Sequence, residues 1–405
     1  MRFKKIAVAV PMMDELENVS RLLSLFEKQS FRDFELYVCV NQPDSWHDDG
    51  DVSHRRICED NASCIQMLAQ SSLPLHVIDR SSPGLGWPPR KHGVGWARKI
   101  LFEYILAQSG FETVIVSMDA DTDFSSDYLS AVLNFFNTNP KVDAVAIPFY
   151  HPLSGNEAYD RSLLRYECYM RHYLIQMLKI ENPYAFCALG SAMAFTAKSY
   201  ARVGGMSPLQ GGEDFYLMQK FAKKGSISNV LVPGNGWKSV PNPDYSFSGM
   251  VFPQGRPSDR VPFGTGPAVS LRMAELESKY PFYAPSAFAE VKRTYDCFHD
   301  LYLSDFNTPM SDFLTQQLDV DFLWQPLRNN YKDVERFSRA CVERVDGLRI
   351  LQFLKSVNDR YPSPYPDLSF ENDALDVLND FRNRLFASEM QLREICCGSS
   401  VFKGV

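Results

Sequence analysis

Short apolar runs alternate with amphipathic segments through the first 150 residues of the chain. The runs are rich in β-branched and aromatic residues and predict buried strands, whereas apolar residues spaced three and four apart predict helices. The predicted strands are Lys5–Pro11, Phe34–Gln42, Leu73–Arg80, Thr113–Asp121 and Val142–Tyr150, and the predicted helices are Glu17–Ser30, Gly95–Gly110 and Ser125–Pro140. This alternation predicts an α/β fold with a mainly parallel central sheet and flanking helices.

The pattern changes in the second half of the chain. An amphipathic helix rich in Tyr and Arg is predicted from about Pro152 to Lys179, and a small-residue strand, a short helix and a glycine turn are predicted within Phe186–Met206. Another helix begins near Glu213, and residues 235–266 predict a long ordered loop because they are rich in Pro, Gly, Ser and aromatic residues. Beyond Val269 the periodicity is mostly helical.

Length and charge restrict the function. The 405 residues exceed what one hydrophobic core usually organises, so we expect an α/β domain of residues 1–268 and a helical C-terminal region of residues 269–405. The net charge of -7 argues against general nucleic-acid binding, because no basic excess is available to neutralise phosphates.

The cysteines and the hydropathy pattern predict a setting for the chain. The nine cysteines are odd in number and form no CxxC pair, which disfavours a zinc site and favours a reducing cytoplasm. The start, MRFKKIAVAVPMMDE, is interpreted as a first strand rather than a secretion signal, because Pro11 and two acidic residues interrupt it. No run is long enough to cross a bilayer, so we expect a soluble protein, with peripheral contact at the inner membrane face left open.

The predicted strand Thr113–Asp121 ends in alternating aspartates, Asp119, Asp121 and Asp123. Such a cluster is unfavourable unless a cation or many hydrogen-bond donors lie among the carboxylates. Ligands gather at the carboxyl ends of strands in open α/β sheets, so Asp119 and Asp121 are candidate ligands of Mg²⁺ or Mn²⁺ that share the ion with a diphosphate. The alternative is a solvated turn in which Asp123 or Ser125 caps the following helix.

Two further acidic segments are candidates for chemistry. Glu213 and Asp214 begin a helix after two glycines, where one of them could act as the general base for an acceptor hydroxyl. The turn after the first strand, with Pro11, Asp14 and Glu15, could seat a nucleobase or a ribose. Acidic residues are also ordinary in the first turn of a helix, which is the alternative for both segments.

Basic residues lie in two glycine-rich segments. Lys91 and Arg98 precede or begin a helix in GLGWPPRKHGVGWARK, where they could meet the phosphates of a nucleotide. Arg256 and Arg260 lie in QGRPSDRVPFGTG, which could close over a charged ligand. The alternative for Lys91 and Arg98 is solvation at the surface.

The order of these motifs resembles that of a family 2 glycosyltransferase with the GT-A fold. The similarity covers about Lys4 to Val240 and is most specific in residues 191–225, where a small-residue strand and a glycine turn precede the acidic pair. The resemblance implies an inverting transfer from a UDP- or GDP-type sugar, assisted by Mn²⁺ or Mg²⁺, to a glycan, a lipid-linked acceptor or a small molecule. It also implies a nucleotide-sugar half of about residues 1–150 and an acceptor half of about residues 151–268.

The resemblance also implies roles for individual residues. Asp121 would be the direct metal ligand beside Asp119, and Asp214 the base beside Glu213. The nucleotide would be surrounded by Pro11, Glu15, Lys91 and Arg98. Relatives carry consecutive aspartates after the second strand where this chain has VNQPD, which leaves Asp44 as the candidate substitute. The Q-x-x-R-W segment of processive members is missing, so a single-addition enzyme is expected.

Two other functions remain as alternatives. A nucleotidyltransferase that forms nucleotide sugars normally needs a glycine-rich basic loop after the first strand, and PMMDELEN has neither glycine nor lysine. A non-catalytic nucleotide-sugar-binding module would not need both the aspartate pair and the Glu213–Asp214 pair. Retention of the anomeric configuration is the alternative to inversion.

Overall fold

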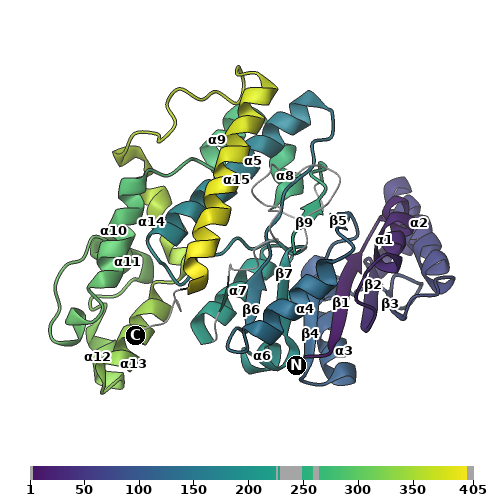
Figure 1. Ribbon diagram of the computed structural model, residues 1–405, viewed down its shortest axis with the longest axis horizontal. Helices are drawn as coiled ribbons and strands as arrows, with labels where there is room; N and C mark the ends of the chain where they lie inside the picture. Colours follow the sequence, from purple (N-terminus) through teal and green to yellow (C-terminus); the bar gives the residue numbers. More distant parts are fainter. Residues whose placement is uncertain (1–2, 225–226, 229–248, 259–263, 399–405) are drawn as a thin grey trace. The chain divides into compact units, whose positions relative to one another are not determined.

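The computed structural model describes residues 3–224, 227–228, 249–258 and 264–398, and these form two compact units (Figure 1). The α/β unit comprises Met1–Leu163 and Cys187–Arg272, and the helical unit comprises Leu164–Phe186 and Met273–Val405. Helix α5 (Glu157–Lys179) therefore contributes most of its length to the helical unit. The sequence places the boundary at residue 268 and assigns all of this helix to the first domain.

The α/β unit is built on a seven-stranded sheet with the order β3-β2-β1-β4-β7-β6-β8. Only β7 runs antiparallel to its neighbours, so the predicted mainly parallel α/β fold is confirmed. The strands are β1 (Lys5–Met12), β2 (Phe34–Asn41), β3 (Leu75–Arg80), β4 (Thr113–Ser117), β6 (Ala144–Ala146), β7 (Met193–Thr196) and β8 (Ile227–Ser228). The side chains of β1 and β4 are buried almost throughout, as expected of central strands covered on both faces.

Helices flank this sheet. They are α1 (Leu16–Glu27), α2 (Val52–Ala69), α3 (Val94–Ser109), α4 (Tyr128–Thr138), α6 (Ala197–Arg202), α7 (Glu213–Lys224) and α8 (Thr265–Val269), with a 3₁₀ turn η1 at Asp44–His47. The sequence pattern predicts α1, α3, α4, the short helix α6 and α7, but not α2. On α2 only Asn61, Cys64 and Leu68 are buried, so its apolar stripe is short for an 18-residue helix.

The strand that carries the aspartates is shorter than predicted. Strand β4 ends at Ser117, and the chain turns at Asp119, whose carbonyl accepts the Thr122 N–H (3.2 Å). Residues Thr122–Phe124 then form β5, which pairs antiparallel with β9 (Val251–Pro253). This pairing brings the segment after β9 alongside Asp121, whose carbonyl accepts the N–H of Gln254 (3.3 Å).

The helical unit consists of helices and loops among its described residues. Besides α5 it contains α9 (Met273–Lys279), α10 (Pro285–Asp296), α11 (Ser311–Leu318), α12 (Gln325–Asn330), α13 (Val334–Arg344), α14 (Gly347–Val357) and α15 (Leu375–Gly398), with 3₁₀ turns η3 (Asp300–Tyr302) and η4 (Asn358–Arg360). The predicted helical character of this region is confirmed. No helix in the described part of the chain combines the length and the apolar composition needed to span a bilayer.

A buried ion network joins α5 to α15 inside the helical unit. Arg171 donates to Glu167 Oε1 (2.9 and 2.7 Å) and to Glu389 Oε2 (2.5 Å). Arg382 also donates to Glu167 (3.4 Å), and Arg393 donates to Glu389 (2.9 Å). The side chains of all five residues are at most 2% exposed. Because they are buried from solvent, we interpret this helical-unit network as a structural feature.

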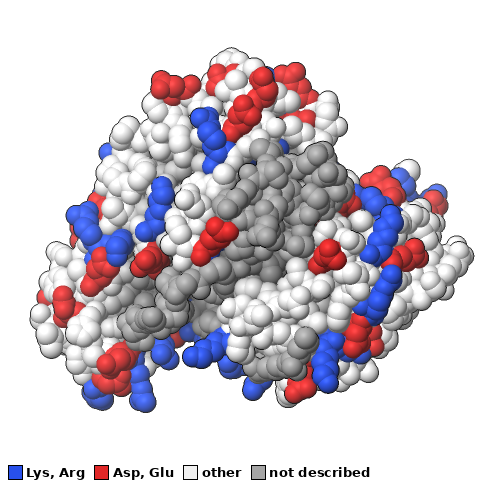
Figure 2. All heavy atoms as spheres, viewed as in Figure 1, with Lys and Arg blue, Asp and Glu red and all other residues white. Residues whose placement is uncertain are grey.

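Acidic and basic side chains are interspersed on the face of the molecule drawn in Figure 2.

Candidate active site

Asp119 and Asp121 lie directly after β4, at the carboxyl end of the sheet beside β1. The Met118 N–H donates to the carbonyl of Ala9 (3.1 Å), which holds this turn against β1. The Asp119 side chain is 37% exposed and that of Asp121 is 16% exposed. Both carboxylates are thus within reach of a ligand at the place predicted for them.

Arg98 of α3 joins the aspartate turn to the acidic pair at the start of α7. Its Nη2 donates to Asp119 Oδ1 (2.5 Å) and its Nη1 donates to Glu213 Oε1. Burial disfavours the charged guanidinium, but Asp119, Glu213 and Asp214 outweigh this effect and raise the pKa of Arg98. The sequence places Arg98 near phosphates, whereas the structure places it in the interior between two carboxylates.

Gly190 provides the room for this buried guanidinium. A Cβ at residue 190 would lie 2.1 Å from Arg98 Nη2, so only glycine lets the backbone approach so closely. The Gly190 carbonyl also accepts a hydrogen bond from Ser117 Oγ at the end of β4 (2.7 Å), which fixes the close approach. The sequence contains no local signal for this contact, because the two residues are 92 positions apart.

The two acids at the start of α7 differ in their surroundings. Glu213 is 2% exposed and held by Arg98, whereas Asp214 is half-buried. Burial raises the pKa of Glu213 to about 7, against the opposing effect of Arg98. Burial also raises the pKa of Asp214 from its ordinary value, and Arg98 again opposes the shift. Both acids therefore hold protons more readily than a carboxyl group in water.

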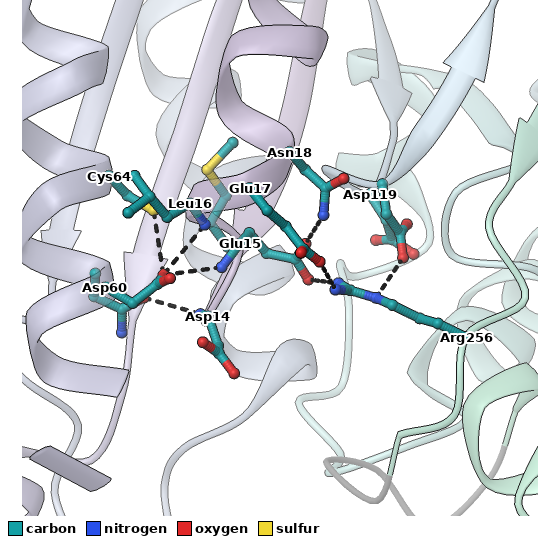
Figure 3. Close-up of polar contacts among 12 residues, drawn as sticks. Asp14, Glu15, Leu16, Glu17, Asn18, Asp60, Cys64, Asp119 and Arg256 are labelled. Atoms are coloured by element: carbon teal, nitrogen blue, oxygen red, sulfur yellow. Dashed lines mark hydrogen bonds and ion pairs between the residues drawn. The ribbon is translucent and has the colours of Figure 1, made fainter. Parts of the chain in front are cut away.

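Arg256 follows β9 and contacts three carboxylates (Figure 3). Its terminal nitrogens donate to Glu15 Oε1 and to Glu17 Oε1 (2.9 Å), and its Nε lies 3.2 Å from Asp121 Oδ2. Burial lowers the pKa of Arg256, but Glu15 and Asp121 outweigh the effect and raise it. Arg260, the other basic residue predicted in this segment, lies outside the described residues.

The turn between β1 and α1 is held by α2. Asp14 has a left-handed backbone (φ 60°), and its N–H donates to Asn61 Oδ1 (3.0 Å) while its carboxylate pairs with Arg56 (2.7 and 2.6 Å). The first N–H groups of α1 donate to Asp60 Oδ1 (3.1 and 3.2 Å), so a side chain from α2 caps this helix. Sequence analysis missed these three α2 residues because it did not predict the helix that carries them.

Three other predicted residues have local positions. Pro11 is buried within β1. Asp44 Oδ1 accepts the N–H groups of Gly84 (2.8 Å) and Gly86 (3.3 Å) and so shapes the loop after β3. Lys91 is exposed in the loop that precedes α3.

Arg98 and Arg256 hold two groups of carboxylates that meet at the aspartate turn, and we name these six carboxylates together the acidic row. These are Glu15, Glu17, Asp119, Asp121, Glu213 and Asp214, and the two guanidinium groups among them are those of Arg98 and Arg256. Carboxylates outnumber guanidinium groups in the row, which agrees with the raised pKa values of Glu213 and Asp214.

The donor set of the row fits a hard divalent cation that has further ligands of its own. In the described part of the chain, no group of three or more His, Cys, Asp or Glu side chains is arranged to hold a metal ion. Asp119 and Asp121 would therefore supply two carboxylates at most. Mg²⁺ and Mn²⁺ are commonly held in this way, by one or two carboxylates together with water and phosphate oxygens.

Comparisons with solved structures give similar proteins of low identity. The mannosyltransferase PcManGT from Pyrobaculum calidifontis, solved in complex with GDP-Man and Mn²⁺, is 14% identical with a TM-score of 0.40, over 96% of this chain and 86% of that chain. TarS from S. aureus, solved with UDP-GlcNAc, is 12% identical with a TM-score of 0.40, over 96% and 90%. The glucosyl-3-phosphoglycerate synthase from Mycobacterium tuberculosis is 17% identical with a TM-score of 0.34, over 56% and 69%.

A family model gives the clearest assignment. No curated protein matches the chain. Residues 114–254, however, match the model for glycosyl transferase family group 2, and this range contains the aspartate turn, β7 and the acidic pair at the start of α7. Residues 114–254 are thus similar to the glycosyl transferases of family group 2.

Proposed function

We propose that the chain is a metal-dependent, inverting glycosyltransferase that moves a sugar from a UDP- or GDP-type donor to an acceptor hydroxyl. The observation that carries the proposal is that Arg98 bonds both Asp119 and Glu213, which brings the aspartate turn next to the acidic pair at the start of α7, where the charges of Arg98 and Asp119 also act on Asp214. A surplus of carboxylates at the end of a central strand suits a cation and a diphosphate, and an acid with a raised pKa suits proton transfer.

Asp119 and Asp121 would hold Mn²⁺ or Mg²⁺ at the diphosphate of the donor. When bound, the ion neutralises the charge that develops on the leaving diphosphate. Arg98 holds one oxygen of Asp119, and the Asp119 side chain remains partly exposed.

Asp214 is the proposed base, and Glu213 is the residue that positions Arg98. Glu213 is buried and bonded, so it has little access to an acceptor, whereas Asp214 is half-buried next to it. The acceptor oxygen would attack the anomeric carbon as the bond from that carbon to the diphosphate oxygen breaks. The hydroxyl proton would pass to the Asp214 carboxylate, and a single displacement of this kind inverts the anomeric configuration.

A cytoplasmic setting is also proposed. In the described part of the chain, seven cysteines form no disulfide bond, which supports a reducing compartment. The acceptor class remains a glycan, a lipid-linked molecule or a small molecule, and the last two differ in whether the protein would touch a membrane surface.

A thermal-shift screen with UDP- and GDP-sugars tests the donor and the metal together. One donor class is expected to raise the melting temperature with Mn²⁺ and to lose most of this effect with EDTA, because bound ligand stabilises the folded state. The Asp121→Asn variant should lose the Mn²⁺-dependent part of this increase in melting temperature. Asp123→Asn is the matched control, because both Asp123 oxygens accept from Arg21 (2.7 Å) outside the row.

Product analysis then separates the alternatives. Release of sugar or transfer product from the stabilising donor is expected with Mn²⁺. Binding without product would indicate the non-catalytic module, and formation of a nucleotide sugar from a nucleoside triphosphate and a sugar phosphate would indicate the nucleotidyltransferase. Equal stabilisation by the donor with Mn²⁺ and with EDTA would contradict the metal site.

A further inference from the structure

Arg256 lies against the carboxylate that the proposed function assigns to the metal. Its Nε is 3.2 Å from Asp121 Oδ2, and its other nitrogens hold Glu15 and Glu17 on the far side of the guanidinium (Figure 3). A divalent cation and a guanidinium are both positive, so they cannot both lie this close to the same carboxylate oxygen without strong repulsion. Arg256 thus occupies a position that a metal bound to Asp121 would contest.

The contact between Arg256 and Asp121 is close but poorly aligned. Arg256 Nε is buried and has no hydrogen-bond partner in the described part of the chain, although Asp121 Oδ2 is near. A donor left in this state costs free energy that a better-placed acceptor would recover. The Arg256 side chain is 27% exposed, and the planar set of donors on its guanidinium matches phosphate oxygens in pairs.

The backbone keeps Arg256 near the site whichever partner its side chain has. Strand β9 pairs with β5 directly after the aspartate turn, and the Gln254 N–H donates to the Asp121 carbonyl. Leu163 leaves no room for a Cβ at Gly255, which would lie 2.4 Å from Leu163 Cδ1, so this segment is also packed on its other side. An exchange of partners by Arg256 therefore requires movement of its side chain only.

We propose that Arg256 is a positioning residue that competes with the divalent cation for Asp121 and transfers to the diphosphate of the nucleotide when the nucleotide binds. This inference rests on the proposed function. The chain then takes up its metal together with the nucleotide rather than before it. Because linkage is reciprocal, the nucleotide raises the affinity for the metal by the same factor as the metal raises the affinity for the nucleotide.

Mn²⁺ binding measured by electron paramagnetic resonance, with and without UDP or GDP, tests the competition. Arg256→Gln is expected to bind Mn²⁺ alone about tenfold more tightly than the wild type, within the usual range for coupling between two sites. The same variant should bind UDP or GDP about tenfold more weakly in the presence of Mn²⁺, because it lacks the diphosphate contact. Mere structural damage would lower both affinities, so the opposite signs are the diagnostic result.

Two further variants keep the test informative. Arg256→Lys retains the charge without the planar fork and should give intermediate values for both affinities. Arg21→Gln removes a guanidinium that pairs with Asp123 of strand β5, and it should leave both affinities unchanged. If either Arg256 variant fails to fold, the other still measures the sign of the change in Mn²⁺ affinity.

The outcomes separate this inference from the proposed function. Wild-type protein that binds Mn²⁺ with UDP or GDP, beside an Arg256→Gln variant with equal or weaker affinity for Mn²⁺ alone, overturns the competition and leaves the proposed function in place. Wild-type protein that binds neither nucleotide in the presence of Mn²⁺ overturns the proposed function and the inference with it.

Discussion

The acidic row of the α/β unit and the buried network of the helical unit use the same two kinds of side chain in opposite proportions. In the row, Arg98 serves two carboxylates and Arg256 serves three. In the network, Glu167 and Glu389 each accept from two arginines. The row is partly open to solvent, whereas the network side chains are at most 2% exposed.

The difference distinguishes the proposed active site from an ion network that stabilises helix packing. Buried ion pairs that are broken leave an uncompensated charge, so a network of this kind fixes how two helices pack. A partly exposed surplus of carboxylates does the reverse, because it is stabilised only when a cation or a donor arrives. We therefore expect substitutions in the row to change chemistry, and substitutions in the network to change stability.

Asp214→Asn should have the largest effect on the row. Loss of a general base costs about 10²–10⁴ in rate, while the shape of the side chain and the donor contacts are retained. Steady-state transfer or hydrolysis of the donor, together with calorimetric donor binding, measures the two effects separately. Near-normal turnover by this variant would remove Asp214 from the role of base.

Arg171→Met should have the largest effect on the network. Removing one partner of a buried ion pair costs about 3–5 kcal/mol of unfolding free energy, measurable by urea denaturation. Lys292→Met in the same unit is the matched control, since its exposed pair with Asp296 (2.8 Å) is worth about 0.5 kcal/mol or less. A folded Arg171→Met protein with an altered Mn²⁺ dependence would break the distinction between the proposed active site and the network.

Gly190→Ala should affect the row through Arg98 alone. The added Cβ must displace a guanidinium that two carboxylates hold in place, and overpacking of this kind costs about 1–3 kcal/mol. Turnover should fall by more than the stability change explains. Ala188→Gly, two residues before Gly190, is the control and should leave turnover within a few-fold of the wild type.

The pH dependence gives the smallest expected effect. Because burial raises the pKa of Asp214, the proposed base, kcat/KM should fall with decreasing pH at a higher pH than an ordinary aspartate would give. Arg98 lowers the pKa of both acids, so Arg98→Gln should move this limb to higher pH by about one unit. Arg21→Gln should not move it, and a wild-type limb below pH 5 would contradict the assignment.

Linkage gives the corresponding sign for stability. The pKa of Glu213 in the folded state lies above its ordinary value of 4.5, so its contribution is fully present below 4.5 and is lost as the pH rises through about 7. Glu213→Gln should therefore reduce the loss of unfolding free energy between pH 5 and pH 8. Denaturation curves at several pH values test this, with Lys292→Met as a variant that should leave the slope unchanged.

Local patterns were sufficient to predict the central strands and most of the helices of the α/β unit. β1 and β2 differ from their predicted ranges by a single residue at one end, because an uninterrupted apolar run predicts both that a strand forms and that it is buried. The helix α2 could not be found this way, since two of its three buried residues are Asn61 and Cys64 rather than large apolar side chains.

The acidic candidates were predicted individually, but their partners could not be. The link from Arg98 to Asp119 and Glu213 spans 21 and 115 positions, and that from Arg256 to Glu15 spans 241. No local periodicity encodes contacts over such separations. The residue types of a single segment therefore predict that Asp121 binds a metal ion. The contact of Asp121 with Arg256 is seen only in the folded structure.

The pairing of β5 with β9 has a consequence for biosynthesis. Strands β1 to β5 and the aspartate turn are all synthesised well before residues 251–256, which contain β9 and Arg256. Domains begin to fold during translation, and loops of this length close late. A nascent chain arrested near residue 230 would thus display the turn with Asp121 not yet neutralised by Arg256, and such arrested chains should be sensitive to free Mg²⁺ in a way that the released protein is not.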